Sequence, residues 1–385
     1  MTDIEIVDDL TVRFITEYPF APFPAHLAHP GGVMISKKQI DEDYQAIENG
    51  EEPGMVINNH PIGTGPFIFD TWESGQQIKL VNNEDYWGDP ALLDSVTFKV
   101  VPEDLTRLAE LKTGEAHISN PLNPSDLKQV EATEDLTVQS QESSALSYIG
   151  FNMEKEPFDD VKVRQAISKA IDKEKIISGV YDDIGLPANG PLAPSIFGYS
   201  DKITGIDYDP KEAKALLKEA GYEDGFTTTI WTDDRRDRVD TATNVQAQLK
   251  EIGIDAEIEI VEWGAMLDLT AAGEHDIFVF GWTTVTGDAD NGLYSLFHSD
   301  NLGSPGNRTF TDDEELDRLI DAARQTIDAD ERQRFYEEAQ ERLEEIAAIV
   351  PIHHQEYLLG VRQEIQGLTQ SPIQILELKD VYIEE

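Results

Sequence analysis

Three tryptophans stand where a small molecule could be held. The chain contains only five tryptophans, and Trp231, Trp263 and Trp282 each lie at or just after the end of a predicted strand. Ligands of open α/β sheets bind beyond the carboxyl ends of the strands. A large amphipathic ring at such a place can line a cleft or cap the local core. Both interpretations stay open, and the cleft is favoured most for Trp282, which follows Gly281 directly.

The segment after Trp282, residues 283–310, is rich in glycine and aspartate and predicts a long loop, which in a compact domain is usually functional or disordered. It contains four polar candidates for ligand binding: Asp288, Asp290, Asn291 and Arg308. The guanidinium of Arg308 could pair with a ligand carboxylate, or it could form a surface ion pair with one of the abundant acids. The two aspartates lack the glutamate spacing of an EF-hand, which argues against calcium.

Signatures of catalysis are missing from the sequence. It has no cysteine, no phosphate-binding loop, no Gly-x-Ser-x-Gly elbow and no His-Glu-x-x-His pair. His353 and His354 are adjacent in a predicted strand, so they should point to opposite faces, one packed and one exposed, and not share a metal. We therefore expect a binding protein without metal or cofactor rather than an enzyme. A hydrolase remains an alternative only if a defined pair of acids faces a cleft.

The elements that must position these residues alternate between strand and helix. β-branched runs, apolar periodicity and terminal glycines predict a strand, a helix, a strand, a short helix and a strand in turn. Their expected ranges are 227–231, 236–252, 254–261, 265–272 and 276–280. This order implies parallel pairing with right-handed crossovers, and hence an α/β fold.

Further elements flank this region. Strands are predicted at 67–69, 77–81 and 95–101, and alternating strands between 350 and 383. Helices are predicted around 38–47, from Pro102 to Gly114, over 163–171, from the Asp209-Pro210 N-cap, from the Thr311–Glu314 capping box and over 330–346. The N-terminal strand 11–15 is expected to begin abruptly, without a preceding partner.

The charge balance is extreme, with 76 acidic and 30 basic residues and a formal net charge of −46. Such a surface repels nucleic acid and anionic lipid, so no nucleic-acid partner is expected. Acids lie on nearly every predicted helix, which favours a halophilic host whose salt screens the self-repulsion over a single acidic partner-binding surface. Neither a membrane-spanning run nor a signal peptide is recognisable in the sequence.

Several motifs, in the correct order and over nearly the whole chain, resemble those of the extracellular solute-binding proteins of family 5, which bind dipeptides, oligopeptides, glutathione or nickel. The most diagnostic runs from Asn152 through Val163-Arg164-Gln165-Ala166-Ile167 to Asp172. The others are Gly63-Thr64-Gly65-Pro66-Phe67, Leu111 to Ile118 with His117 in place of the usual aspartate, Tyr208-Asp209-Pro210 to Gly221, and Gly281-Trp282 to Asp290-Asn291.

The resemblance implies a two-lobed, periplasmic-binding-protein-like (type II) fold that closes around its ligand. It implies a monomeric, extracytoplasmic, cell-surface-associated component of an ABC importer, which delivers a peptide-like or other small polar solute to permease subunits. In peptide binders of the family, an aspartate three residues after the cleft tryptophan receives the peptide amino group. That position is Val285 here, so Asp288 or Asp290 would have to substitute.

The resemblance also predicts the domain organisation. Residues 1–60 would be the remnant of a small N-terminal subdomain, 61–150 plus 358–385 an incomplete first lobe, and 151–357 the second, ligand-binding lobe. The chain would then be an N-terminally truncated haloarchaeal member, with an exposed sheet edge and apolar surface in its first lobe. A fragment that no longer binds solute, with a structural or regulatory role, is the alternative.

Overall fold

The computed structural model describes residues 1–384, which form two compact units. Unit 1 contains residues 1–29 and 142–356, and unit 2 contains residues 30–141 and the C-terminal stretch from 357 onward. Both internal boundaries fall within long strands, β7 (Leu136–Phe151) and β12 (Ile349–Arg362), so each of these strands contributes residues to both units. The division into three family subdomains stays a prediction.

The sheet of unit 1 has the predicted topology. β9 (Phe226–Thr232) pairs in parallel with β10 (Ile254–Ile260) on one side and β11 (Ile277–Thr283) on the other. α9 (Arg236–Glu251) connects β9 to β10, and α10 (Trp263–Ala271) connects β10 to β11. Beyond β11 the order continues through antiparallel β7 to β12, against which the short β8 (Leu186–Pro187) pairs.

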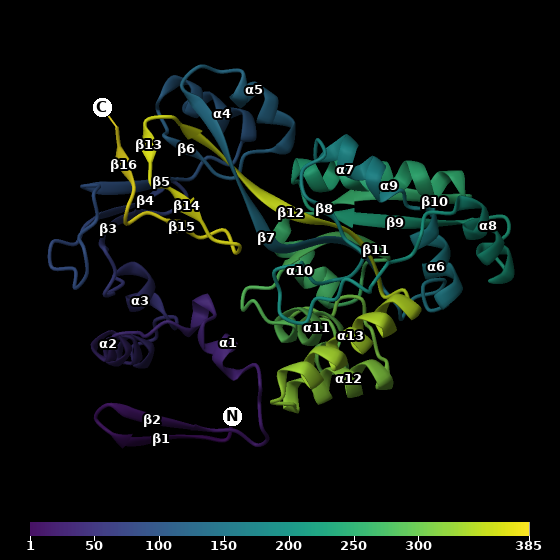
Figure 1. The fold of residues 1–385 in the computed structure, drawn as a ribbon, viewed down its shortest axis with the longest axis horizontal. Coiled ribbons are helices and arrows are strands. Elements are labelled where there is room, and N and C mark those ends of the chain that lie inside the picture. The colour runs from purple at the N-terminus through teal and green to yellow at the C-terminus, as the bar shows by residue number, and fades with distance from the viewer. Residues whose placement is uncertain (385) are drawn as a thin grey trace. The chain divides into compact units, whose positions relative to one another are not determined.

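Helices cover both faces of this sheet (Figure 1). α6 (Val161–Ala170), α7 (Lys173–Val180), α8 (Pro210–Glu219) and α9 share one apolar core with the sheet. α10, α11 (Ala289–Phe297), α12 (Glu314–Gln325) and α13 (Ala329–Glu345) share the other. Successive residues of β11 alternate between these cores, with Ile277 and Val279 in the first and Phe278 and Phe280 in the second, as the period of a strand requires.

Part of the large acidic content caps helices. The carboxylate of Asp209 accepts hydrogen bonds from the backbone N–H groups of Lys211 and Glu212, both at 3.0 Å, which confirms the predicted Asp-Pro start of α8. Five further helices of unit 1 begin in the same way, at Asp160, Asp172, Asp288, Asp313 and Asp328. Aspartate at these positions satisfies free N–H groups and faces the positive end of the helix dipole.

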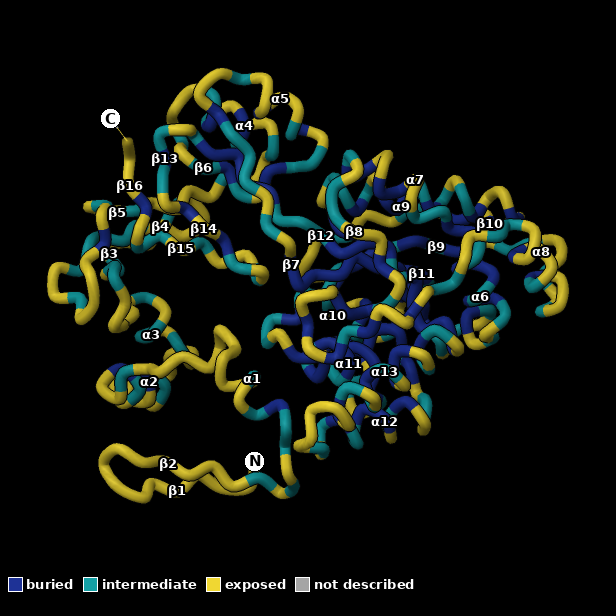
Figure 2. Tube along the Cα trace, viewed as in Figure 1, coloured by how far each residue is buried: buried dark blue, intermediate teal, exposed yellow. Residues whose placement is uncertain are grey.

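The prediction that strand 11–15 lacks a preceding partner is wrong. β2 (Thr11–Ile15) pairs antiparallel with β1 (Asp3–Asp8), and the Asp8 carboxylate accepts from the N–H of Leu10 to close the turn. Both strands of this hairpin are exposed along their whole length (Figure 2). The apolar–acidic alternation of Ile4-Glu5-Ile6 was the signal for β1. A short helix, α1 (Phe23–Leu27), follows the hairpin.

The prediction of one long loop over residues 283–310 is also wrong, because α11 lies in the middle of this segment. The side chain of Asp288 accepts from the N–H of Asp290 and caps the helix. Leu293, Leu296 and Phe297 are buried and anchor it in the second core. The glycines and aspartates of the segment obscured this apolar face. A 3₁₀ turn, η3 (Ser299–Asn301), follows.

The two adjacent histidines are both buried, so the expectation of one packed and one exposed ring is wrong. His353 is 1% exposed and His354 5%. They do point to opposite sides of β12, but this part of the strand belongs to unit 1 and both of its faces are covered. Burial lowers the pKa of His353 to about 3 and that of His354 to about 4.

Unit 2 contains an antiparallel sheet of β3 (Phe67–Glu73), β4 (Gln77–Asn82) and β5 (Ser95–Lys99), all three as predicted. Its helices are α2 (Lys37–Glu48), α3 (Met55–Asn59), α4 (Asp104–Thr113) and α5 (Leu127–Glu131). α4 ends at Gly114, whose φ of 81° is left-handed, as predicted for a C-terminal glycine. The remaining strands are short: β6 (Ile118–Ser119), β13 (Ile365–Gln366), β14 (Thr369–Gln370), β15 (Leu376–Glu377) and β16 (Tyr382–Ile383). None of the helices among residues 1–384 is long and apolar enough to cross a membrane.

Candidate functional site

A stack of aromatic rings and guanidinium groups lies at the carboxyl ends of the parallel strands in unit 1. Trp263 is the first residue of α10 and lies three residues past the end of β10, and its ring centroid is 5.5 Å from that of Phe280 on β11. The guanidinium of Arg238 lies 5.1 Å from the Trp263 ring and 5.7 Å from the Phe280 ring. The guanidinium of Arg308 lies 5.9 Å from Phe280. The structure therefore brings together two of the predicted site residues, Trp263 and Arg308, around Phe280.

Arg238 and its partner Asp233 were not among the predicted site residues. Arg238 donates from Nη1 to Oδ2 of Asp233 at 2.8 Å, and both side chains are buried. Burial raises the pKa of Asp233 despite the opposing charge of Arg238, and burial lowers the pKa of Arg238. A signal was available, because Arg235, Arg236 and Arg238 cluster just past β9 in a chain with only 30 basic residues.

Three buried polar atoms at this edge have no hydrogen-bond partner among the described residues. They are Oγ1 of Thr232, Oδ1 of Asp233 and Nε1 of Trp282. Buried polar side-chain atoms in native proteins are nearly always hydrogen-bonded, so each such exception needs an explanation. All three lie at or just past the carboxyl ends of β9 and β11, where ligands of such sheets bind.

Trp231 has a different environment. Its Nε1 donates to Oγ1 of Thr229 at 3.1 Å, and its ring packs, half-buried, against the second core. Trp282 packs against the same core. Of the three tryptophans, Trp263 is the most exposed, at 43%. The role of each in binding solute stays a prediction.

Asp288 is held by an arginine of α13. Arg332 makes a bidentate contact with its carboxylate, with Nη1 2.7 Å from Oδ2 and Nη2 2.6 Å from Oδ1, and it also donates to the hydroxyl of Tyr336. Both members of the pair are buried. This geometry is the strong fork-to-fork arrangement of guanidinium and carboxylate, and it fixes the start of α11 to α13.

Asp290 is held from two sides. Nε of Arg324 on α12 lies 2.9 Å from its Oδ1, and Nε2 of His26 lies 2.8 Å from its Oδ2. Arg324 in turn stacks on Tyr294 at 3.4 Å from the ring centroid. Asp290 is 1% exposed. Both predicted aspartates are thus engaged in ion pairs within unit 1.

The last two predicted residues also have partners within the protein. Oδ1 of Asn291 accepts from the N–H of Val285 at 3.0 Å and closes the turn between β11 and α11. Arg308 is buried rather than at the surface, and it donates from Nε to Oγ1 of Thr270 and from Nη1 to the carbonyl of Pro305. No three His, Asp or Glu side chains among residues 1–384 are grouped so that they could hold a metal ion.

Comparisons with known proteins agree with this architecture. The model of the bacterial extracellular solute-binding proteins, family 5 (middle region), matches residues 1–304. The chain belongs to this family. It is the substrate-binding component of an ABC importer. The family match confirms the resemblance found in the sequence, and the similar structures confirm the predicted periplasmic-binding-protein-like α/β fold. The family is one of extracellular solute-binding proteins, not of enzymes.

Among the curated relatives is the dipeptide-binding protein of Escherichia coli K12, 32% identical over 100% of this chain and 72% of that protein. One similar solved structure is the periplasmic binding protein DppA of Helicobacter pylori in complex with the peptide STSA. It is 33% identical, with a TM-score of 0.90 over 100% of this chain and 74% of that chain. Another is the dipeptide-binding protein of Pseudoalteromonas sp. SM9913 in complex with Met-Leu, 28% identical, with a TM-score of 0.89 over 100% of this chain and 76% of that chain.

Proposed function

We propose that this chain captures a short peptide for an ABC importer, and that the peptide's polar groups meet the carboxyl ends of β9 and β11 in unit 1. The observation that carries the proposal is the set of buried atoms without partners: Thr232 Oγ1, Asp233 Oδ1 and Trp282 Nε1. They offer a hydroxyl, a carboxylate oxygen and an N–H donor, which suit the amides and the charged termini of a peptide. Relatives that are named for dipeptides, and similar structures that are solved with peptides, support this solute class.

The aromatic–guanidinium stack supplies the second part of the proposed site. Trp263 offers an exposed face beside Arg238, which suits an apolar peptide side chain or a peptide plane. The guanidinium of Arg238 donates one hydrogen bond to Asp233, and its remaining N–H groups can donate to a peptide carboxylate. In peptide-binding relatives the position of Val285 carries an aspartate that binds the peptide amino group. Asp288 and Asp290 cannot replace it, because their carboxylates already pair with Arg332 and Arg324. We assign the amino group to Asp233 instead.

We further propose that the protein acts outside the cytoplasm at the cell surface and hands its solute to the permease subunits of the importer. The family's extracellular setting supports this location. We propose that it acts as a monomer.

A pair of tryptophan substitutions tests the assignment. Trp282→Phe keeps an aromatic ring but removes the Nε1 donor that has no partner in the protein. We expect it to weaken dipeptide binding about two- to tenfold, the worth of one hydrogen bond. Because the smaller ring also loses packing against the second core, the melting temperature should fall in both tryptophan variants, and the affinity is what distinguishes them. Affinity is measured by fluorescence titration.

Trp231→Phe is the matched control, because its Nε1 already donates to Thr229. This variant should lose stability and keep its affinity. If Trp282→Phe binds dipeptides as the parent does while Trp231→Phe loses affinity, the proposed site is misplaced.

A further inference from the structure

Arg308 carries a buried positive charge in unit 1 that has no carboxylate partner. The residue is 9% exposed, and no acid among residues 1–384 forms an ion pair with it. Its Nε donates to the hydroxyl of Thr270 and its Nη1 to the carbonyl of Pro305, and both acceptors are neutral. Burial lowers the pKa of Arg308, and the interaction that opposes this shift comes from Tyr148 rather than from an acid. A buried charge without a counter-charge is costly, so this guanidinium needs an explanation.

The three other arginines of the described chain that are buried to this degree have acids beside them. Arg238 and Arg332 form ion pairs with aspartates, and the charges of two further aspartates act on Arg164. With 76 acidic residues for 30 basic ones, a buried cation without an acid beside it is unexpected. Arg308 therefore marks a place from which the chain's own carboxylates are absent.

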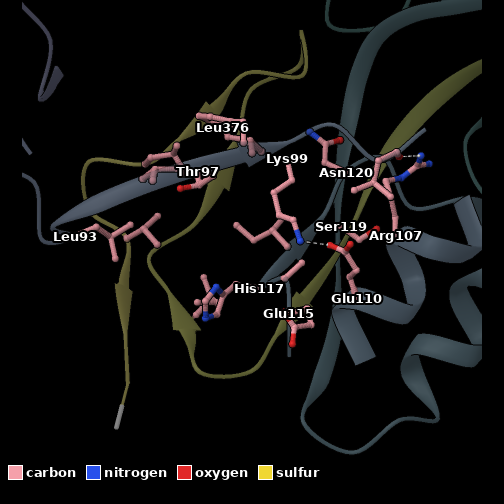
Figure 3. Close-up of a pocket in the computed structure, with 18 of the residues that line it drawn as sticks. Leu93, Thr97, Lys99, Arg107, Glu110, Glu115, His117, Ser119, Asn120 and Leu376 are labelled. Carbon is pink, nitrogen blue, oxygen red and sulfur yellow. Dashed lines mark hydrogen bonds and ion pairs between the residues drawn. The ribbon is translucent and has the colours of Figure 1, made fainter. Parts of the chain in front are cut away.

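The cavity of unit 2 offers no comparable cation. This cavity has a volume of about 520 Å³, and Lys99 and Arg107 are among the residues that line it. Nζ of Lys99 lies 2.6 Å from Oε2 of Glu110, as Figure 3 shows, and Arg107 pairs with Asp104. Because both positive charges are paired within the unit, an anion would gain little by binding there.

Arg308 lies beside the proposed solute site of unit 1. Its guanidinium and that of Arg238 lie 5.9 Å and 5.7 Å from the centroid of the same ring, Phe280. Tyr148 is paired directly opposite Phe280, on β7. Burial raises the pKa of Tyr148, and the positive charges of Arg308 and Arg238 both oppose this rise. The two guanidinium groups thus share one neighbourhood in the carboxyl-terminal half of β11.

Arg308 also keeps hydrogen-bond donors for a ligand. A guanidinium has five N–H groups in a planar fork, and Nε and Nη1 each donate one of theirs within the protein. The N–H groups of Nη2 make no hydrogen bond to any residue that the structure describes. A carboxylate is the group that matches such a fork, with short, charge-assisted hydrogen bonds.

We propose that the solute is a short peptide whose last residue is acidic, an inference that rests on the proposed function. The terminal carboxylate of the peptide pairs with Arg238, and the carboxylate of its last side chain pairs with Arg308. A single acidic residue at the peptide's end carries both groups a few bonds apart, so it can reach two guanidinium groups that lie against one ring. The bound side chain supplies the counter-charge that Arg308 lacks.

The test compares dipeptides that differ in one carboxylate. Alanyl-glutamate is compared with alanyl-glutamine, and alanyl-lysine reverses the charge. Calorimetric titrations of the unmodified protein in about 1 M sodium chloride screen the overall negative charge of the chain, while a partly buried ion pair is screened much less. Alanyl-glutamate is expected to bind at least about tenfold more tightly than alanyl-glutamine, and alanyl-lysine no better than alanyl-glutamine.

Three variants show whether Arg308 is the cation responsible. Arg308→Gln removes the charge but keeps an amide donor, and it should abolish the preference for glutamate over glutamine. Arg308→Lys keeps the charge without the fork and should retain part of the preference. Arg318→Gln removes one positive charge at an exposed position of α12, so it should keep the full preference. Circular dichroism checks that the variants are folded, and the titrations of the unmodified protein decide even if Arg308→Gln does not fold.

The outcomes separate this inference from the proposed function. If none of the dipeptides binds, both fail. If they bind but the glutamate and glutamine forms bind equally, or if the lysine form binds most tightly, the proposed function stands and the acidic preference is overturned. A preference for glutamate that Arg308→Gln retains would also overturn the inference, because another cation would then recognise the side chain.

Discussion

Some polar residues of unit 1 make all their contacts within the protein, and others keep polar atoms without a partner. The sequence could not distinguish these two groups. Asp288, Asp290 and Asn291 have the composition of a ligand-binding loop, yet each makes its contacts within the protein. Arg332, the partner of Asp288, lies 44 residues further along the chain, so no local pattern connects them. Asp233 and Arg238 are only five residues apart, and the basic cluster around them was visible in the sequence. Only the strand and helix geometry shows which polar atoms remain without a partner.

The buried pair of Asp288 and Arg332 should be costly to break. Arg332→Ala leaves a buried carboxylate uncompensated, and we expect the free energy of unfolding to fall by about 3–5 kcal/mol. Arg334→Ala on the same helix is the control. Its side chain is 71% exposed, and its Nη2 lies as far as 4.0 Å from Oε1 of Glu331, so this ion pair is weak. Its loss should change the free energy of unfolding by less than about 0.5 kcal/mol. Urea unfolding measures both, and similar losses for the two variants would contradict the account.

The buried histidines should make stability depend on pH. With folded pKa values of about 3 and about 4, His353 and His354 are neutral in the native state, while unfolded histidines take up protons below about pH 6.5. Unfolding therefore binds protons in this window, and stability falls as the pH drops from 6.5 toward 4. Each histidine contributes a slope of up to about 1.4 kcal/mol per pH unit.

Replacement of one histidine tests this slope. His353→Phe keeps an aromatic ring against Tyr181, whose ring centroid is 3.9 Å away, and should make the loss of stability below pH 6.5 shallower. His60→Phe, at an exposed position, should leave the pH profile unchanged. Identical profiles for His353→Phe and the parent would refute the argument.

At the scale of elements, the sequence predicted most of the architecture. The alternation of strands and helices between residues 226 and 283 was clear because glycine ends both helices and β-branched residues fill the strands. β1 was missed because it is short and wholly exposed, so only its alternation of apolar and acidic residues marks it. α11 was missed because aspartates and glycine interrupt its apolar face. What holds α11 in place is packing against α12 and α13, which no local propensity reveals.

Contact between strands β7 and β11 gives a prediction at this scale. A Cβ atom at Gly150 would lie 2.2 Å from Cζ of Phe278, which is fully buried and cannot withdraw. Gly150→Ala should therefore destabilise the protein by about 1–3 kcal/mol or more. Gly179 on α7 has open space around its Cα, so Gly179→Ala should stabilise by about 0.5–1 kcal/mol. Thermal melts of both variants check these signs, and a neutral Gly150→Ala would show that the core can rearrange.

At the scale of the whole molecule, the dominant feature is a net charge of −46. Self-repulsion of this size is screened by salt, since the Debye length falls from about 30 Å at 0.01 M to about 3 Å at 1 M. We expect the melting temperature to rise steadily between these concentrations of sodium chloride. A flat or falling melting temperature in calorimetric scans would contradict this expectation. Adaptation to a saline host stays a prediction.

The central claim is that this chain captures short peptides, and isothermal titration calorimetry of the unmodified protein against di- and tripeptides tests it most directly. We predict saturable binding at one site per chain for at least one peptide, with no chemical turnover of the bound peptide. A protein that melts cooperatively yet gives no binding heat with any peptide at two temperatures would contradict the claim.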